Sequence, residues 1–502
     1  MDDHVRVYVT SYSEEVTGSN THVNILFPGG RTVAFLVDCG LFQEKQYVEL
    51  NYEKFKYSPS NINFAIATHV HTDHVGRFPY LVREGFFGNI YTSYETKVVM
   101  PTILKETCER LKEEFESDFK KFNDHKRTIR KFKLDAKGRG KKDKQRSEKI
   151  KLKNKNIKVT KPTLIFESDD IGHCMKHVLN KKLYEPFSPC DGIEITFFPN
   201  AHIGGAVLVF CRIFDEKDEI TLLFTGDIGM KNTVTNQVTD IPDEVAQKVD
   251  FVVSESTHGS AEYSKNTQKE RNNHINIIQD TYNRRGTIMY MSNSLERPEV
   301  LLKDLLKMKE EGLDIIDEFN IYLDTTFGIS CLKKYKKLYG TDYLPKNFKI
   351  IDKNSREQVM AEKGPKMIIC TSPHFKHGSF LNYGARMLED SNVTLIFVAY
   401  VPEDVRNMAH LSCGSKIIFL GEEVILRCKR VLLSYYSSHA YTDELDEFFT
   451  KFKNIKAILF NHGAIESKIN YVERYKTDSI TTHNLLNGKA VLLSKNGIEK
   501  IL

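Results

Sequence analysis

The sequence predicts an α/β protein, because short apolar runs typical of buried strands alternate with longer stretches typical of helices. Strand-like runs recur along the whole chain, at residues 33–37, 64–67, 251–253, 287–290, 367–370, 395–398 and 457–460. Histidines and carboxylates follow several of these runs directly. The same pattern therefore predicts both the fold class and a chemically active region where strands end.

Length and composition indicate a multidomain protein. The 502 residues suggest two or three domains, and a hydrophobic fraction of 40% suffices for their cores. The N-terminus lacks the pattern of a secretory signal, and no apolar run approaches the ~18 residues of a membrane span. The nine cysteines are scattered without a CxxC pair, which favours free thiols in a reducing compartment. We therefore expect a cytoplasmic protein that does not associate with membranes.

Positive charge is concentrated in one segment. Residues 121–160 hold 17 Lys and Arg against 4 Asp and Glu, a local balance of +13, whereas the whole chain carries +5. A predicted helix from Thr102 through Phe119 precedes the segment, and Gly138 and Gly140 suggest a turn between two arms. This basic insertion, about residues 105–160, could bind nucleic-acid phosphates, and a solvated insertion without a ligand is the alternative.

A histidine-rich segment, Thr68 to His74, follows the apolar run at residues 64–67. The imidazoles of His69, His71 and His74 and the carboxylate of Asp73 lie within six residues. Zinc prefers such ligands, and alternate side chains of a loop that leaves a strand can face two adjacent ions. Manganese suits the same ligands. The alternative is a loop of solvent-exposed histidines.

Further ligands must come from other strand ends, because one loop cannot complete two coordination spheres. His202 follows the alternating strand at 193–197, and Asp227 ends the apolar run at 222–226. In this order the motifs resemble those of metallo-β-lactamase-fold hydrolases, which form an αββα sandwich. The resemblance implies two zinc ions, the first bound by His69, His71 and His202, the second bound by Asp73 and His74, with Asp227 bridging both.

Three later residues narrow the resemblance. Glu255 and His462 follow the strands predicted at 251–253 and 457–460, and His439 lies in the segment 437–440. They resemble motifs A, C and B, respectively, of the β-CASP nucleases. This group contains the endonuclease of the cleavage and polyadenylation machinery and ribonuclease J. Histidine at motif C is typical of members that act on RNA, whereas valine is typical of the DNA-repair branch. The resemblance implies an RNA substrate and makes His462 the last ligand of the second zinc.

The order of the motifs predicts how the domains are arranged. Motifs B and C come after the cap strands in sequence and yet must reach the metals, so the α/β β-CASP cap is expected to be an insertion. We predict that it spans residues 256–430 and that residues 1–255 and 431–502 form the two parts of the metallo-β-lactamase domain.

The predicted catalytic residues are His439, Glu255 and Asp73. Two zinc ions can activate water and stabilise charge on a phosphodiester, which leaves the departing oxygen in need of a proton. His439 is expected to donate it, with Glu255 as the orienting partner. It is equally compatible with the sequence that Glu255 orients a metal-bound histidine through a hydrogen bond.

Candidate RNA contacts are Arg297, Ser372 and His374. The turn at residues 371–375 departs from the Ser-Gly turn with which relatives usually help hold the RNA backbone or its 5′ end. An internal ion pair is the alternative for Arg297, and an ordinary loop is the alternative for the turn.

The predicted function is hydrolysis of RNA phosphodiester bonds by a metal-dependent endoribonuclease in RNA processing or decay. A 5′–3′ exoribonuclease of the ribonuclease J type is the first alternative. A non-catalytic RNA-binding scaffold is an alternative of another class, and its mark would be lost metal ligands. The cap and His462 argue against a small-molecule hydrolase. RNA is the expected partner, and the quaternary state, including a homodimer, is left open.

Overall fold

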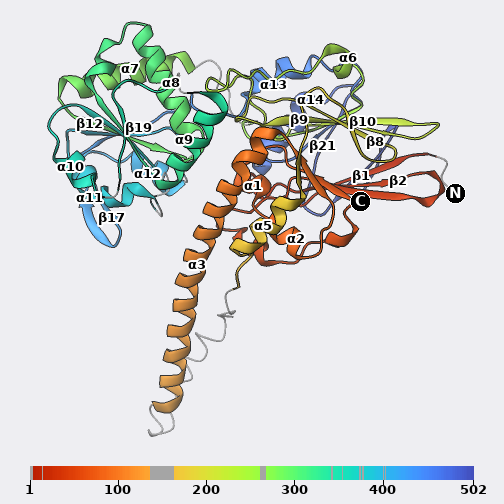
Figure 1. Ribbon diagram of the computed structural model, residues 1–502, viewed down its shortest axis with the longest axis horizontal. Helices are drawn as coiled ribbons and strands as arrows, with labels where there is room; N and C mark the ends of the chain where they lie inside the picture. Colours follow the sequence, from red (N-terminus) through yellow and green to blue (C-terminus); the bar gives the residue numbers. More distant parts are fainter. Residues whose placement is uncertain are drawn as a thin grey trace.

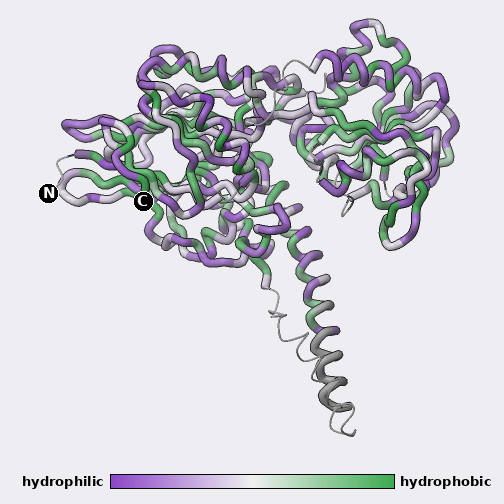
Figure 2. The backbone as a smooth tube through the Cα atoms, turned by 180° about the vertical axis from the view of Figure 1, so that it is seen from behind, coloured by the Kyte–Doolittle hydropathy of each residue, from purple (hydrophilic) through white to green (hydrophobic). Residues whose placement is uncertain are grey.

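The computed structural model describes residues 4–13, 15–135, 163–259, 267–340, 343–352, 354–371, 375, 378–399, 401 and 403–502. The chain forms two lobes, and a long helix, α3 (Tyr94–Asp135), projects from one of them (Figure 1). The two ends of the chain lie on this same lobe, which we call the sandwich lobe. Hydrophobic segments gather in the interior of both lobes (Figure 2).

Two sheets form the centre of the sandwich lobe. The first has the order β23-β22-β1-β2-β3-β4-β5-β6 and comprises β1 (Arg6–Ser11), β2 (Thr21–Leu26), β3 (Thr32–Val37), β4 (Phe64–Ile66), β5 (Asn89–Thr92), β6 (Val178–Asn180), β22 (Ala490–Ser494) and β23 (Gly497–Ile501). The second has the order β21-β20-β11-β10-β9-β8-β7 and comprises β7 (Phe187–Cys190), β8 (Ile193–Pro199), β9 (Val207–Phe214), β10 (Glu219–Phe224), β11 (Phe251–Ser254), β20 (Ala457–Phe460) and β21 (Thr481–Asn484).

The sheets pack face to face because alternate side chains of each strand are apolar on the inner side. Phe35 of β3 is fully buried between them, with its ring 4.8 Å from Phe64 and 6.3 Å from Phe224 of the opposite sheet. The next residue, Leu36, faces the other way and joins a cluster with the helices outside. Both faces of the sheet are therefore covered, as an αββα sandwich requires.

Helices cover the outer face of each sheet. The first sheet is covered by α1 (Thr72–Val75), α2 (Phe78–Arg83), α3 and α5 (Ser168–His177). The second is covered by α6 (Asp243–Ala246), α13 (Thr442–Phe449) and α14 (Ile465–Tyr475). The predicted metallo-β-lactamase-like sandwich is confirmed in its architecture.

The other lobe is built on a six-stranded sheet whose neighbouring strands all run parallel. Its order is β14-β13-β15-β12-β16-β19, with β12 (Thr287–Ser292), β13 (Asn320–Asp324), β14 (Phe348–Ile350), β15 (Lys366–Thr371), β16 (Val393–Phe397) and β19 (Lys429–Leu432). A hairpin of β17 (Lys416–Phe419) and β18 (Glu422–Ile425) lies beside it.

A parallel sheet needs apolar cover on both faces. In β12, Ile288 and Tyr290 face α7 (Thr267–Asn283), α8 (Arg297–Glu310) and α9 (Thr326–Tyr339). Met289 and Met291 face α10 (Arg356–Ala361), α11 (Gly384–Glu389) and α12 (Glu403–Ala409). The α/β character predicted for the cap is therefore confirmed.

Helix α3 is longer at both ends than the sequence indicates. It starts before Pro101 rather than after it, because Val99 and Met100 are fully buried against the first sheet and this packing offsets the backbone bond that proline removes. Its C-terminal part extends into the basic insertion and ends at Asp135. The remainder of that insertion, including Gly138 and Gly140, lies outside the described residues.

Candidate metal centre and active site

The candidate site residues gather at one edge of the sandwich because the strands before them point the same way. Strands β10, β11 and β20 are parallel neighbours, so their carboxyl ends meet, and Asp227, Glu255 and His462 follow those ends. Strand β8 runs in the same direction through two antiparallel pairings and leads to His202. The parallel pair β3 and β4 leads to the histidine-rich loop from the opposite sheet.

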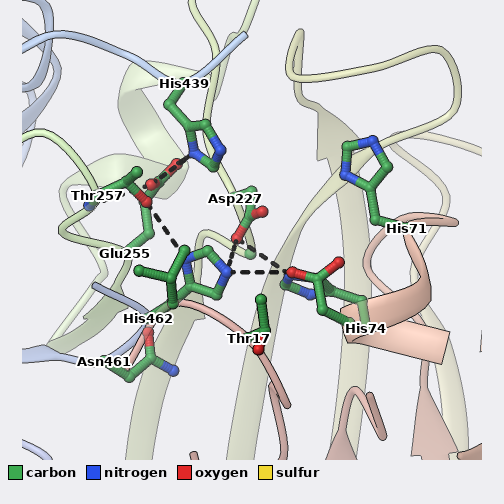
Figure 3. Close-up of polar contacts among 12 residues, drawn as sticks. Thr17, His71, His74, Asp227, Glu255, Thr257, His439, Asn461 and His462 are labelled. Carbon is green, nitrogen blue, oxygen red and sulfur yellow. Dashed lines mark hydrogen bonds and ion pairs between the residues drawn. The ribbon is translucent and has the colours of Figure 1, made fainter. Parts of the chain in front are cut away.

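Asp227 lies between two sets of donors. Its Oδ2 atom is 3.7 Å from Nε2 of His69 and 3.6 Å from Nε2 of His202. Its Oδ1 atom is 3.2 Å from Nε2 of His74 and 3.3 Å from Nε2 of His462. Figure 3 shows the carboxylate between His74 and His462. One carboxylate thus presents each oxygen to a different pair of histidines.

Asp227 reaches this position through Gly226, which follows β10 with a φ of 55°. A β-carbon at residue 226 would lie 2.9 Å from Oγ1 of Thr68. Glycine is therefore needed here both for the positive φ and because the histidine-rich loop passes so close.

The first donor set consists of His69, His71, His202 and Asp227. The Nδ1 atom of His71 lies 3.0 Å from Nε2 of His69 and 3.2 Å from Nε2 of His202. Burial lowers the pKa of His69 and His202 well below the usual histidine range, so both imidazoles are neutral and carry a free lone pair. Neutral imidazole is the form that binds a metal.

The second donor set consists of Asp73, His74, Asp227 and His462. Three buried atoms of this set, Nε2 of His74, Nε2 of His462 and Oδ1 of Asp227, make no hydrogen bond with any residue that the structure describes. Buried polar atoms rarely lack a partner, and atoms that converge in this way fit a cation between them. Each of the two donor sets can therefore hold a divalent metal ion.

Most of the histidines are oriented by their other ring nitrogen. Nδ1 of His202 lies 3.2 Å from the carbonyl oxygen of Ser438, and Nδ1 of His462 lies 3.3 Å from Oγ1 of Thr257. Nδ1 of His69 lies 3.1 Å from Oγ1 of Thr68. Such contacts fix the tautomer that leaves Nε2 free for a metal.

Asp38 has a role that sequence reasoning did not assign. Its Oδ2 atom lies 2.7 Å from Nδ1 of His74, and its Oδ1 atom accepts the backbone N–H of Thr68 at 2.8 Å. Burial alone would lower the pKa of His74, but in the metal-free chain Asp227 and Asp38 outweigh it and raise that pKa well above the usual value. A metal that binds Nε2 would displace this proton, while Asp38 would still accept from Nδ1. The sequence signal was a carboxylate directly after the strand at 33–37; that this strand pairs with the one before the histidine-rich loop is known only from the structure.

His439 and Glu255 form an ion pair beside the donor sets. Nδ1 of His439 lies 2.8 Å from Oε2 and 3.0 Å from Oε1 of Glu255, which is itself buried and accepts the backbone N–H of Ile228. Burial opposes a charge on His439, but Glu255 and then Asp227 and Asp73 outweigh it and raise the pKa of His439 to about 9. The imidazole is therefore protonated at neutral pH.

Comparison with known families gives two matches that agree with this geometry. Residues 18–134, in the sandwich lobe, match the model of the metallo-beta-lactamase superfamily, and residues 299–406, in the six-stranded lobe, match the model of the Beta-Casp domain. The chain thus contains a metallo-β-lactamase superfamily domain and a β-CASP domain. We refer to the two lobes from here as the metallo-β-lactamase lobe and the β-CASP lobe.

Three relatives illustrate the similarity over the whole chain. A ribonuclease of Thermus thermophilus is 23% identical over 458 residues, which cover 88% of this chain and 90% of the relative. A transcription termination factor, FttA, of Methanococcus maripaludis is 22% identical over 86% of this chain and 64% of the relative. The endoribonuclease ysh1 of Schizosaccharomyces pombe is 22% identical over 86% of this chain, which spans only 51% of that protein's length.

His258 is a further residue near this site that the sequence analysis did not single out. Its Nε2 atom lies 2.8 Å from Oγ of Ser437, and its ring lies 5.9 Å from that of His439. Burial, followed by the charge on His439, lowers its pKa to about 4. His258 is therefore neutral and supports the segment that carries His439. Its position three residues after Glu255 was the available signal.

Of the three residues predicted to contact RNA, the structure describes only Arg297. Arg297 begins α8 at the junction of the lobes, where it is half-buried and where burial lowers its pKa. Ser372 and His374 lie outside the described residues. Among the helices that the structure describes, none has the length and apolar content needed to cross a membrane.

Proposed function

We propose that this protein is a zinc-dependent endoribonuclease that hydrolyses RNA phosphodiester bonds with a two-metal centre. The observation that carries the proposal is the position of Asp227, whose two oxygens face two separate donor sets. In this proposal His69, His71 and His202 bind one zinc ion, Asp73, His74 and His462 bind the other, and Asp227 bridges them. Manganese would suit the same ligands.

When bound, the two ions supply a hydroxide nucleophile at neutral pH and neutralise charge on the scissile phosphate. The protein itself must then supply the proton for the leaving oxygen. His439 is suited to this step, because the carboxylate of Glu255 holds its Nδ1 side and leaves Nε2 to face the site. The charge and hydrogen bond of Glu255 raise the pKa of His439, which favours the protonated imidazole at neutral pH.

Glu255 therefore acts on His439 in this proposal rather than as a metal ligand. The groups around Asp227 also include Glu255 and His439 as a third set that could hold a cation. A metal at that position would compete with the ion pair that these two side chains already form at 2.8 Å. The ion pair favours the acid role.

An RNA substrate is supported by the relatives, two of which are named ribonuclease or endoribonuclease. We also propose that the inserted β-CASP domain spans about residues 256–430. Its support is that β11 and β20 pair with each other in the metallo-β-lactamase lobe, while the strands from β12 to β19 form the six-stranded sheet and the β17–β18 hairpin of the other lobe. All nine cysteines are free, which supports a cytoplasmic location.

The proposal is tested with RNA labelled separately at its 5′ and 3′ ends and carrying either a 5′-hydroxyl or a 5′-monophosphate. We expect internal fragments from both RNAs, at similar rates, and no cleavage by the Asp227→Ala variant, which loses its metals. Release of mononucleotides that requires a 5′-monophosphate would instead identify an exonuclease. RNA binding without cleavage, at full metal content, would identify a scaffold.

A further inference from the structure

Glu296 adopts a backbone conformation that its residue type disfavours. It immediately precedes α8 in the β-CASP lobe, with φ 59° and ψ −30°. A residue with a β-carbon occupies this left-handed region only where its surroundings hold it there. Its side chain makes no capping hydrogen bond to α8, so the helix does not explain the conformation.

The side chain instead crosses to the metallo-β-lactamase lobe. The backbone N–H of Gly204 donates to Oε1 at 3.1 Å and to Oε2 at 3.3 Å, and Nδ2 of Asn232 donates to Oε1 at 2.7 Å. Gly204 lies two residues after His202. The carboxylate of one lobe is thus bound directly to the loop that carries a proposed metal ligand of the other.

The same carboxylate reaches the other side of that loop through Asn232. Oδ1 of Asn232 accepts the backbone N–H groups of Val234 and Thr235 and so shapes the turn that follows it. Beyond this turn, Oγ1 of Thr239 accepts the backbone N–H of Ala201 at 2.8 Å. The residues before and after His202 are therefore both held by one connected network.

Side chains of the β-CASP lobe also pack closely against Gly204. Glu296 is 3% exposed, and a β-carbon at Gly204 would lie 2.7 Å from Oη of Tyr339, which ends α9. Gly204 is therefore in close contact with the β-CASP lobe, while the carbonyl of Gly205 accepts hydrogen bonds from Ser93 and Thr96 of its own lobe.

The charge of Glu296 agrees with this arrangement. Burial raises its pKa to about 7, and the hydrogen bonds from Asn232 and Gly204 and the charge of Arg297 oppose that rise. Both donors are N–H groups, which need an acceptor, so they favour the ionised carboxylate. The other titratable groups that act on or respond to this carboxylate are Glu299, Tyr335 and Tyr339.

We propose that Glu296 is a positioning residue, through which the β-CASP lobe fixes the His202 loop and with it the geometry of the first metal site. The inference rests on the proposed function only in taking His202 as a metal ligand. Contacts that orient a ligand from outside the coordination sphere usually change metal affinity by about 10–100-fold. The β-CASP lobe would then be required to complete the metal centre as well as to cover it.

Two variants and one matched control test the proposal in the zinc-loaded full-length chain. Glu296→Gln keeps the shape of the side chain but offers a single acceptor oxygen, and Glu296→Gly removes the carboxylate while accepting the left-handed backbone. Glu299→Gln is the control. It changes a buried carboxyl group one turn further along α8, and Glu299 makes no hydrogen bond to the 201–205 loop among the described residues.

The first measurement is the rate of zinc release to a chromophoric chelator, and the second is amide hydrogen exchange of residues 201–205 in the metal-free chain. We expect Glu296→Gly to release one of two zinc ions about tenfold faster and to exchange these amides faster. Glu296→Gln, which keeps one acceptor oxygen, should change both in the same direction but less, and Glu299→Gln should match the wild type. Unchanged release and exchange in both Glu296 variants, or equal changes in the control, would overturn the proposal.

The result remains separable from the proposed function. If the wild type failed to cleave RNA, zinc release and amide exchange would still report on the loop. If the wild type bound no zinc, the proposed metal centre would fail, and equal amide exchange in the wild type and the variants would overturn the positioning role independently.

Discussion

Nδ1 of His439 lies 2.8 Å from Oε2 of Glu255, although the two residues are separated by the entire β-CASP lobe in the sequence. The pair forms because β11 and β20 are adjacent parallel strands, and the segment before α13 returns the chain to their carboxyl ends. The insertion thus leaves the acid and its partner in one lobe. Several expected outcomes follow from this arrangement and from the donor sets beside it.

Replacing the proposed acid should affect chemistry and spare the metals. His439→Ala is expected to lower the single-turnover rate of RNA cleavage by about 10²–10⁴, the usual contribution of a general acid. Metal content, measured by elemental analysis, should stay at the wild-type level because the other donors remain. A variant that loses an ion would show instead that His439 is a metal ligand.

Glu255 should determine the pH above which RNA cleavage slows, because it keeps the proposed acid His439 protonated. Glu255 raises the pKa of His439, so the protonated, active form persists above the usual histidine range and is lost as the pH rises through the raised pKa. Glu255→Gln removes the largest of the effects that raise this pKa while burial still opposes the charge, so the alkaline limb of the pH–rate profile should move to lower pH. The rate above the new pKa then falls about tenfold per pH unit.

Single-turnover rates between pH 6 and 10 provide the measurement. A Glu255→Gln profile that keeps the wild-type alkaline limb, with only a uniform decrease in rate, would exclude Glu255 as the group that sustains the charge on His439.

Asp38 should control one metal site without binding a metal. Asp38→Ala removes the acceptor for Nδ1 of His74 and is expected to weaken the second site by about 10–100-fold. Asp38→Asn, which keeps one acceptor oxygen, should have the smaller effect. Competition titration with a zinc chelator measures both variants. Equal affinities for the two variants and the wild type would remove Asp38 from the centre.

The basic insertion should contribute to RNA affinity through charge. Replacing the Lys and Arg residues of segment 121–160 with Ser should weaken RNA binding and flatten its salt dependence, because each lost phosphate contact removes a log–log slope of roughly 0.7. Cleavage of saturating RNA should continue, since the donor sets lie elsewhere. Replacement of the exposed Lys489 and Lys500 is the control. An unchanged slope in the insertion variant would show that the segment is only solvated.

The sequence was sufficient to predict the architecture and to nominate the donors. Histidine and carboxylate residues at strand ends are local signals, and parallel strands necessarily bring such ends together. The α/β class could be predicted because apolar runs recur with the length of buried strands. The αββα sandwich and the cap were implied by the resemblance of the motifs to a known family.

Contacts between distant segments could not be predicted in this way. The role of Asp38 depends on the pairing of β3 with β4, and the bond from Glu296 to Gly204 joins residues 92 positions apart across two lobes. The helix predicted to start at Thr102 starts earlier, because the burial of Val99 and Met100 is a tertiary effect that local periodicity does not contain.

A two-metal centre requires that the two carboxylate oxygens of Asp227 bind two different ions. The decisive measurement is the number of metal ions per chain, determined by elemental analysis after reconstitution with excess zinc and removal of free metal. We expect two zinc ions per chain in the wild type. Asp227→Ala removes the bridging carboxylate, so this variant should not retain tightly bound zinc. A wild-type content of one ion or none would contradict the two-metal centre.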